Sequence, residues 1–193
     1  MKFGEGDSEG IIMKWKKYWG VIPLGIYLVL QLSILTIGSL TESSLRSVPE
    51  MVLFWFGVLS GLTFIFWMGS MIFRWRHIRN FRGYSVLKII FLMAFIFLLM
   101  GTMYFGMFVS TFRYEPEHIV ERNGIRMVAS VNSFLQKMVY YYEYKNLLFH
   151  GTEQIGWEDY GNGSGDPLER GEEPNRWYFE DLDGNMIEKG GEY

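Results

Sequence analysis

Cysteine is absent from all 193 residues, so no disulfide supports any part of the fold. Charge is absent from three long apolar runs, at about residues 20–40, 51–73 and 89–110, and none of them contains Asp, Glu, Lys, Arg or His. A soluble core helix would show a polar face at helical spacing, whereas these runs are apolar all round. We therefore expect membrane helices rather than core helices.

Each run is long enough to cross a bilayer, whose hydrocarbon core is about 30 Å thick and requires about 20 helical residues. The sequence predicts a cytoplasmic N-terminal segment, 1–19, and then a three-helix transmembrane region, 20–111. A cleaved signal peptide explains the first run less well, because the run exceeds an h-region of about 7 to 15 residues. The cleavage pattern is also missing at Gly38-Ser39-Leu40, so an uncleaved anchor is expected.

Acidic residues are scarce in the first part of the chain and abundant in the tail. Only five of the 21 acids precede Arg113, whereas ten of the 18 basic residues do, which leaves 16 acids and 8 bases in the tail. This split excludes a single soluble globule of mixed surface and argues against nucleic acid as a partner. A disulfide-free external domain is typical of a Gram-positive envelope.

The basic residues of the short segments predict the orientation, because Lys and Arg favour cytoplasmic loops. The first external loop, 41–50, contains only Arg46. The cytoplasmic side is marked by Lys2, Lys14, Lys16 and Lys17 before the first helix, and by Arg74, Arg76, Arg79, Arg82 and Lys88 before the third. We therefore expect an integral cell membrane protein with a cytoplasmic N-terminus and an extracytoplasmic C-terminal domain.

The tail, 112–193, has the pattern of a small antiparallel β-rich domain. Asn123-Gly124 is a strong hairpin signal, because a type I′ turn needs positive φ at both central positions. Alternating residues predict strands at 125–131 and 137–144, which 147–149 would extend, and another hairpin around Asp183-Gly184. The glycines and prolines of 160–175 predict a long surface loop.

No signature of an enzyme or a metal site is present. Walker A, HExxH, GxSxG and CxxC motifs are missing, and His77, His118 and His150 share no ligand spacing. Asp181, Asp183, Asn185 and Glu192 match four positions of a calcium-binding EF loop, but Met186 replaces the required glycine. A hairpin turn is the better explanation, and we predict no catalytic residue, no metal and no cofactor.

Tyrosines on both faces of the 137–144 strand indicate a candidate binding face. The face that contains Met138, Tyr140, Tyr142 and Tyr144 has more apolar mass, so we expect it to form the core. Tyr141 would then be exposed beside Trp157, Asp159, Tyr160 and Asn162, and these five residues are the candidate partner contacts. The alternative is that all these aromatic residues pack the domain on itself or on the membrane.

Within the second apolar run, Gly57 and Gly61 form a GxxxG spacing that permits close helix packing. The alternative is that glycine is simply frequent in membrane helices. The runs contain no ionisable relay of the kind that pumps and ion-coupled carriers need, which argues against transport by this chain alone.

The tail also resembles a group of known proteins, over about residues 118–167. Residues 140–151 read YYYEYKNLLFHG and are followed by EDYGNG at 158–163 and by Asp166-Pro167. This segment resembles the tails of small, uncharacterised membrane-tethered proteins of Gram-positive bacteria. The resemblance implies an envelope protein, with protection of its own cell from a toxin as a further hypothesis.

Three functions remain open. The first is a non-enzymatic interaction protein, in which the helices anchor an external β-rich domain that binds a protein or envelope component, or a second copy. The second is an accessory subunit of a membrane transport or secretion complex. The third is an enzyme at the membrane surface, which lacks support because no nucleophile, base or metal constellation is present.

Overall fold

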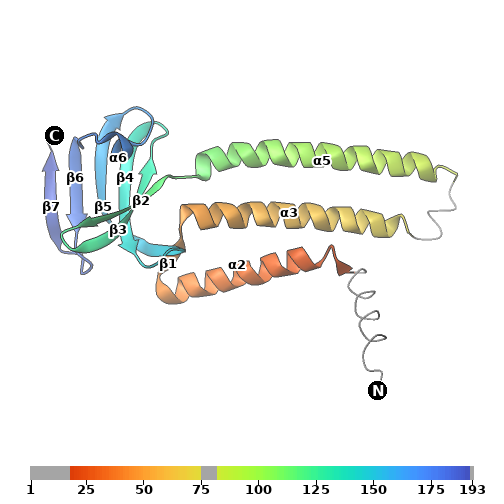
Figure 1. The fold of residues 1–193 in the computed structure, drawn as a ribbon, viewed down its shortest axis with the longest axis horizontal. Coiled ribbons are helices and arrows are strands. Elements are labelled where there is room, and N and C mark those ends of the chain that lie inside the picture. Colours follow the sequence, from red (N-terminus) through yellow and green to blue (C-terminus); the bar gives the residue numbers. More distant parts are fainter. Residues whose placement is uncertain (1–17, 75–81, 192–193) are drawn as a thin grey trace, which may run out of the picture. The chain divides into compact units, whose positions relative to one another are not determined.

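The computed structural model describes residues 18–74 and 82–191. The chain divides into two compact units (Figure 1), each assembled from segments that are separated in sequence. One unit consists of Met1–Leu32 and Leu53–Phe108, and the other consists of Ser33–Val52 and Val109–Tyr193. The first unit is helical, and the second contains a β-sheet.

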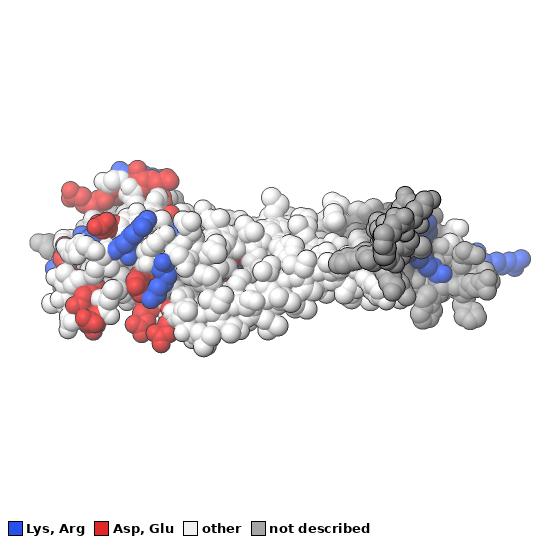
Figure 2. Space-filling view, turned by 60° about the horizontal axis from the view of Figure 1, so that its bottom comes forward, with Lys and Arg blue, Asp and Glu red and all other residues white. Residues whose placement is uncertain are grey.

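Three long helices account for the three apolar runs: α2 (Ile22–Thr41), α3 (Ser47–Ile72) and α5 (Tyr84–Arg113). All three are long and apolar enough to cross a membrane. The helical surface that faces the reader in Figure 2 is almost free of charged side chains. Helix α3 begins at Ser47, earlier than predicted, because Pro49 needs no N–H donor in the first turn and Glu50 suits the positive helix terminus.

Aromatic rings pack against glycines in the helical unit. The Phe91 ring lies where a Cβ on Gly69 would be, and the Trp55 ring lies similarly close to Gly106. Phe91 also contacts Phe73, with ring centroids 5.1 Å apart. These contacts let bulky side chains pack between helices whose outward faces remain apolar and exposed.

The second unit contains one antiparallel sheet of seven strands, in the order β2-β3-β4-β5-β6-β7, with β1 paired to β5. The strands are β1 (Ser43–Leu45), β2 (Glu117–Arg122), β3 (Ile125–Asn132), β4 (Gln136–Tyr144), β5 (Phe149–Asn162), β6 (Arg176–Glu180) and β7 (Met186–Gly191). Among the described residues, strands β2 to β7 therefore each pair with the strand that is next in sequence.

Strand β1 comes from the short segment between α2 and α3. Ser43, Ser44 and Leu45 lie opposite Gly151, His150 and Phe149 of β5, whereas β6 pairs with β5 further along, at Gly156 to Asp159. The β-rich unit is therefore larger than the predicted segment 112–193, because it includes residues 33–52. A three-residue strand gives too short an alternation to recognise in sequence.

The two predicted hairpins are confirmed. Asn123 and Gly124 have positive φ values of 52° and 77° between β2 and β3, and Gly184 has a φ of 80° between β6 and β7. The predicted loop 160–175 is partly wrong, because β5 continues to Asn162 and a short helix, α6, spans Pro167–Arg170. The Asp166 side chain caps this helix by accepting hydrogen bonds from Leu168 N and Glu169 N.

The core of the sheet unit is one cluster on a single face of the sheet. Its buried members are Met127, Ala129, Val131, Val139, Tyr141, Ile155, Tyr160 and Phe179. Arg122 of β2 lies 4.1 Å above the Phe179 ring of β6, and its Nε lies 3.3 Å from the Glu188 carboxylate of β7. Strands at opposite ends of the sheet order therefore approach each other, so the sheet curls around this core.

Candidate functional site

The sheet divides the five predicted binding residues between its interior and its surface. Tyr141 and Tyr160 are buried, with exposed fractions of 4% and 8%, and Asp159 is buried as well. Trp157 is half-buried, and Asn162 is exposed at the end of β5. The prediction of an exposed Tyr141 is therefore wrong, and only Trp157 and Asn162 of the predicted set reach the surface.

The alternation predicted for β4 is present, but its two faces are exchanged. Tyr141 lies opposite Ala129, and Val139 lies opposite Val131, so the small apolar side chains of β3 select the core face of β4. Tyr142, which was expected in the core, is half-buried on the other face. The apolar mass of one strand could not identify its core face, because the paired strand decides it.

A buried carboxylate explains why two tyrosines enter the core. Glu158 Oε2 accepts hydrogen bonds from the Tyr141 hydroxyl, at 2.5 Å, and from the Tyr160 hydroxyl, at 2.6 Å. Arg122 donates to Glu158 Oε1 at 2.8 Å and balances its charge. Burial and then the hydrogen bond to Glu158 raise the pKa of both phenols well above its ordinary value, so both remain neutral donors.

The adjacent Asp159 is held equally firmly on the other side of β5. Its carboxylate accepts hydrogen bonds from Arg176 at 2.5 Å, from Gln136 at 3.1 Å and from Gly161 N at 2.8 Å. Burial alone would raise the pKa of Asp159, but the hydrogen bonds from Arg176, Gly161 and Gln136 outweigh it and lower the pKa. Asp159 therefore stabilises the sheet as an ion.

An aromatic cleft crosses the last three strands of the sheet. Trp157 of β5 lies opposite Tyr178 of β6, which lies opposite Lys189 of β7, so the three side chains share one face. These residues and Arg176 line a cleft of about 360 Å³. Because Tyr140 of β4 also lies opposite Trp157, a row of aromatic side chains extends from the cleft into the middle of the sheet.

Trp177 contributes backbone to this cleft, but its side chain points to the opposite face of β6 and packs against the core. Its indole packs against Gly190, where a Cβ would overlap the ring. The indole Nε1 is buried and has no hydrogen-bond partner among the residues that the structure describes. A buried donor without a partner costs about 1–3 kcal/mol, so this indole lowers the stability of the core side rather than serving the cleft.

Sequence reasoning predicted Trp157 but missed Tyr178 and Lys189 as its neighbours. The sequence predicts a hairpin around Asp183-Gly184, yet nothing in its pattern shows that its first strand, β6, pairs with β5. The cleft depends on this pairing, which places residues 157, 178 and 189 in one cross-strand row. The alternation within one strand does not show with which strand it pairs, or in which register, when a long connection separates the two.

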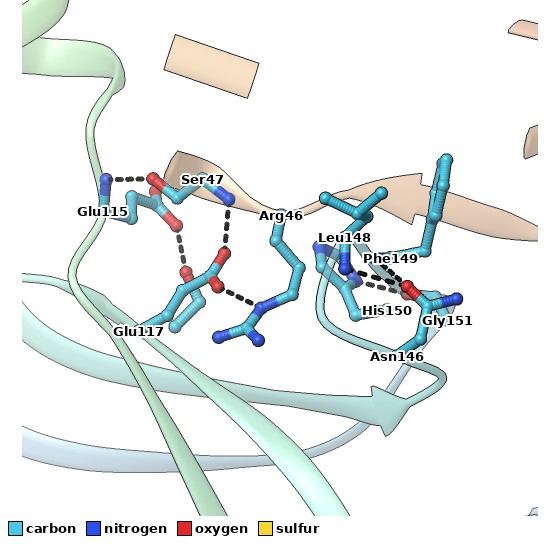
Figure 3. A network of polar contacts seen from close by, with 10 residues as sticks. Arg46, Ser47, Glu115, Glu117, Asn146, Leu148, Phe149, His150 and Gly151 are labelled. Atoms are coloured by element: carbon cyan, nitrogen blue, oxygen red, sulfur yellow. Dashed lines mark hydrogen bonds and ion pairs between the residues drawn. The ribbon is translucent and has the colours of Figure 1, made fainter. Parts of the chain in front are cut away.

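A polar network ties the segment between α2 and α3 to the sheet (Figure 3). Glu117 of β2 accepts hydrogen bonds from Arg46 Nε at 2.7 Å and from the Ser47 amide at 2.6 Å. The Ser47 hydroxyl accepts one from the Glu115 amide at 3.1 Å. Arg113 at the end of α5 pairs with Glu50. The side chains of Arg46 and Glu117 are only 12% and 6% exposed, so salt screens this ion pair less than a surface pair.

One group in the described part of the chain has the donor types of a metal site. His118, Asp166 and Glu169 each offer a ligand atom, and the three atoms lie within 4.8 Å of one another. The donors are already engaged, however: His118 Nε2 lies 2.6 Å from Asp166 Oδ2, and Asp166 Oδ1 caps α6. These hydrogen bonds explain the arrangement without an ion, and they attach the Gly-rich loop to β2.

The remaining histidine and carboxylate candidates also have local explanations. His150 Nδ1 lies 2.6 Å from the Gly151 carbonyl, and its ring packs on Tyr142 with centroids 4.7 Å apart. Asp181 Oδ1 accepts from the amides of Asp183 and Asn185, as the predicted hairpin turn requires. His77 and Glu192 lie outside the described residues.

The two glycines of the GxxxG spacing have different surroundings. A Cβ on Gly57 would lie 2.7 Å from ring atoms of Tyr27, so α2 approaches α3 closely at this position. Gly61 has no atom within 4 Å of the corresponding point. Of the predicted orientation residues, Arg74 and Arg82 are exposed, and the others lie outside the described residues: Lys14, Lys16, Lys17, Arg76 and Arg79.

We compared the chain with protein-family models, with curated proteins and with solved structures, and found no match. The functional argument therefore depends on the geometry of the molecule itself.

Proposed function

We propose that the chain is a non-enzymatic integral membrane protein whose sheet unit, outside the cell membrane, binds a protein or an envelope component. The observation that carries this proposal is the aromatic cleft formed by Trp157, Tyr178 and Lys189. Aromatic side chains held on strands provide a large contact area and lose little conformational entropy on binding. A protein segment with apolar or aromatic side chains suits this cleft best.

The pairing of β1 with β5 supports the membrane arrangement. Residues 43–45 and 149–151 belong to one sheet, and α3 and α5 lie between them in the chain. If both helices span the bilayer, the chain crosses twice and returns to the same side, as this pairing requires. The basic residues on both sides of the apolar runs then favour an external sheet unit and a cytoplasmic N-terminus.

The polar network keeps the sheet unit together. Arg46 and Ser47 precede or begin α3, Arg113 ends α5, and their partners hold these helix ends against the first strand of the tail. A binding surface that is preorganised within its own unit loses less entropy when a partner docks.

The buried carboxylates favour binding over catalysis. Glu158 and Asp159 each accept three hydrogen bonds from neighbouring groups of the fold. A general acid or base must reach the proton that it transfers, whereas these two carboxylates are buried and occupied. An immunity-type role, protecting the cell from a toxin, agrees with the resemblance of the tail and specifies a protein as the partner.

Site-specific photocrosslinking in intact cells tests the proposal. A photoreactive phenylalanine analogue at Tyr178, in the cleft, should give a discrete adduct with one partner. The matched control is the same analogue at Leu182, which is exposed in the β6–β7 turn. Trp157→Ala should weaken the adduct at least tenfold. If Tyr178 gives no adduct, or both positions give the same products, the cleft is not the binding site.

A further inference from the structure

A second cleft, in the helical unit, has the composition of a lipid site. It lies where α3 ends and α5 begins, and it has a volume of about 300 Å³. This volume is at the lower end of the range for small-molecule sites. Its lining combines apolar side chains with two cations, so the cleft offers an amphipathic ligand both apolar and charged contacts.

The two helices contribute matching sets of residues. Positions 66, 70, 73 and 74 on one side and 84, 88, 91 and 92 on the other both follow the spacing i, i+4, i+7 and i+8. This spacing aligns side chains along one helical face. The rings of Phe66, Phe73 and Phe91 and the side chain of Leu92 form the apolar wall.

Local contacts fix the shape of the cleft. The Phe91 ring packs into the space left by the missing side chain of Gly69, and the Phe73 ring lies 5.1 Å from it. The Tyr84 hydroxyl donates a hydrogen bond to the Phe73 carbonyl at 3.3 Å, which joins the end of α3 to the first turn of α5. The apolar wall is therefore held by the fold before any ligand binds.

The two cations, Arg74 and Lys88, have no matching acid nearby. Residues 51–112 contain no Asp or Glu. Among the residues that the structure describes, no carboxylate forms an ion pair with either side chain. Lys88 lies one residue before the third apolar run, and Arg74 lies one residue after the second. Cations at these positions meet the level of phospholipid headgroups if α3 and α5 span a bilayer.

We propose that this cleft binds one anionic phospholipid. The phosphate lies between Arg74 and Lys88, and the upper part of an acyl chain lies along Phe66, Phe73 and Leu92. An anion is required because the site contains two cations and no acid, and a lipid is favoured over a free phosphate because the wall is apolar. The site is independent of the aromatic cleft, so its failure would leave the proposed external binding function intact.

The test uses the full-length protein in mild detergent, titrated with phosphatidylglycerol and separately with phosphatidylcholine, and bound lipid is counted by native mass spectrometry. Phosphatidylglycerol should bind at least tenfold more tightly. The double variant Arg74→Gln, Lys88→Gln should lose about tenfold or more of this affinity. The matched control is Arg82→Gln, because Arg82 is an exposed base close to α5 that does not line the cleft.

Two further arms identify the ligand chemistry. Phe66→Ala should weaken phosphatidylglycerol binding, and glycerol 1-phosphate, the headgroup without acyl chains, should fail to compete at the lipid concentrations used. Equal loss in Arg82→Gln would show nonspecific attraction by the basic loop and overturn the proposal. Equal affinity for the two lipids would also overturn it, and effective competition by glycerol 1-phosphate would reassign the site to a free phosphate ester.

Discussion

At the scale of single residues, the sheet unit depends on ions that the fold has removed from water. Glu158 is buried with a full set of partners, and so is its neighbour Asp159, on the opposite face of β5. Removing one partner of a buried charge costs more than the pair contributes, because the remaining ion loses its compensation. A hydrogen-bond donor should therefore matter for stability when its carboxylate partner is buried, and matter little when that partner is exposed.

The tyrosine hydroxyls of the sheet provide a direct comparison. Tyr141→Phe removes one of three donors from buried Glu158 and should lower the free energy of unfolding by about 1–3 kcal/mol. Tyr178→Phe removes a hydroxyl that bonds to half-exposed Glu180 at the surface and should leave stability nearly unchanged. Thermal denaturation of both purified variants measures the difference. Equal effects would mean that the Glu158 cluster does not stabilise the core.

Acid should destabilise the sheet unit through Asp159. The fold lowers the pKa of this carboxyl, so its ionised form contributes stability above the unfolded pKa, which is about 3.9. That stability is lost as the pH falls through this value toward the folded pKa. Asp159→Asn should therefore reduce stability at pH 7 and flatten its decline between about pH 5 and pH 3. Asp183→Asn, in the exposed turn, is the control and should preserve the full decline.

At the scale of secondary-structure elements, local sequence signals predicted the helices and turns better than they predicted which strands pair. The absence of charge located α2, α3 and α5, and Asn123-Gly124 located the first hairpin. Strand β1 and the long course of β5 were missed, because they are stabilised by pairing with each other and with β4 and β6. The prediction that Tyr141 is exposed was wrong for the same reason, because pairing with β3 decides which face of β4 lies in the core.

Two glycines of α3, Gly57 and Gly61, allow a matched comparison of the same substitution. Gly57→Leu places a side chain against the Tyr27 ring and should lower thermal stability by about 1–3 kcal/mol through overpacking. Gly61→Leu adds the same volume and the same helix propensity where nothing lies within 4 Å, so it should not lower stability. Melting temperatures in one detergent measure both. A larger loss at Gly61 would mean that this position packs against another chain.

At the scale of the whole molecule, the chain forms its sheet from two segments separated by two long helices. Residues 43–45 add to a strand more than 100 positions later in the sequence, and Thr152 also bonds to the Glu42 carbonyl across 110 positions. Both segments must therefore lie on the same side of any membrane that α3 and α5 cross. Composition and spacing located the helices, but long-range contacts, this pairing and the Arg46–Glu117 ion pair, relate their ends to the tail.

A disulfide tests this pairing in a chain without background cysteines. Ser44 and His150 are direct partners in β1 and β5, and antiparallel partners lie about 4.5–5.5 Å apart at Cα, within the range that a disulfide bridges. Ser44→Cys with His150→Cys should therefore oxidise in isolated membranes to an internally linked species. This species should migrate differently on a denaturing gel until it is reduced.

The control pair is Ser44→Cys with Ser164→Cys. Residue 164 lies beyond the other end of the 14-residue strand β5, tens of ångströms from residue 44 along that strand. This pair should remain reduced within a single chain under the same mild oxidation. Linkage in the control alone, or in neither pair, would show that the first loop and the tail do not form one sheet. We expect the Ser44–His150 pair to link, because the Arg46–Glu117 ion pair also holds this loop against the sheet, at β2.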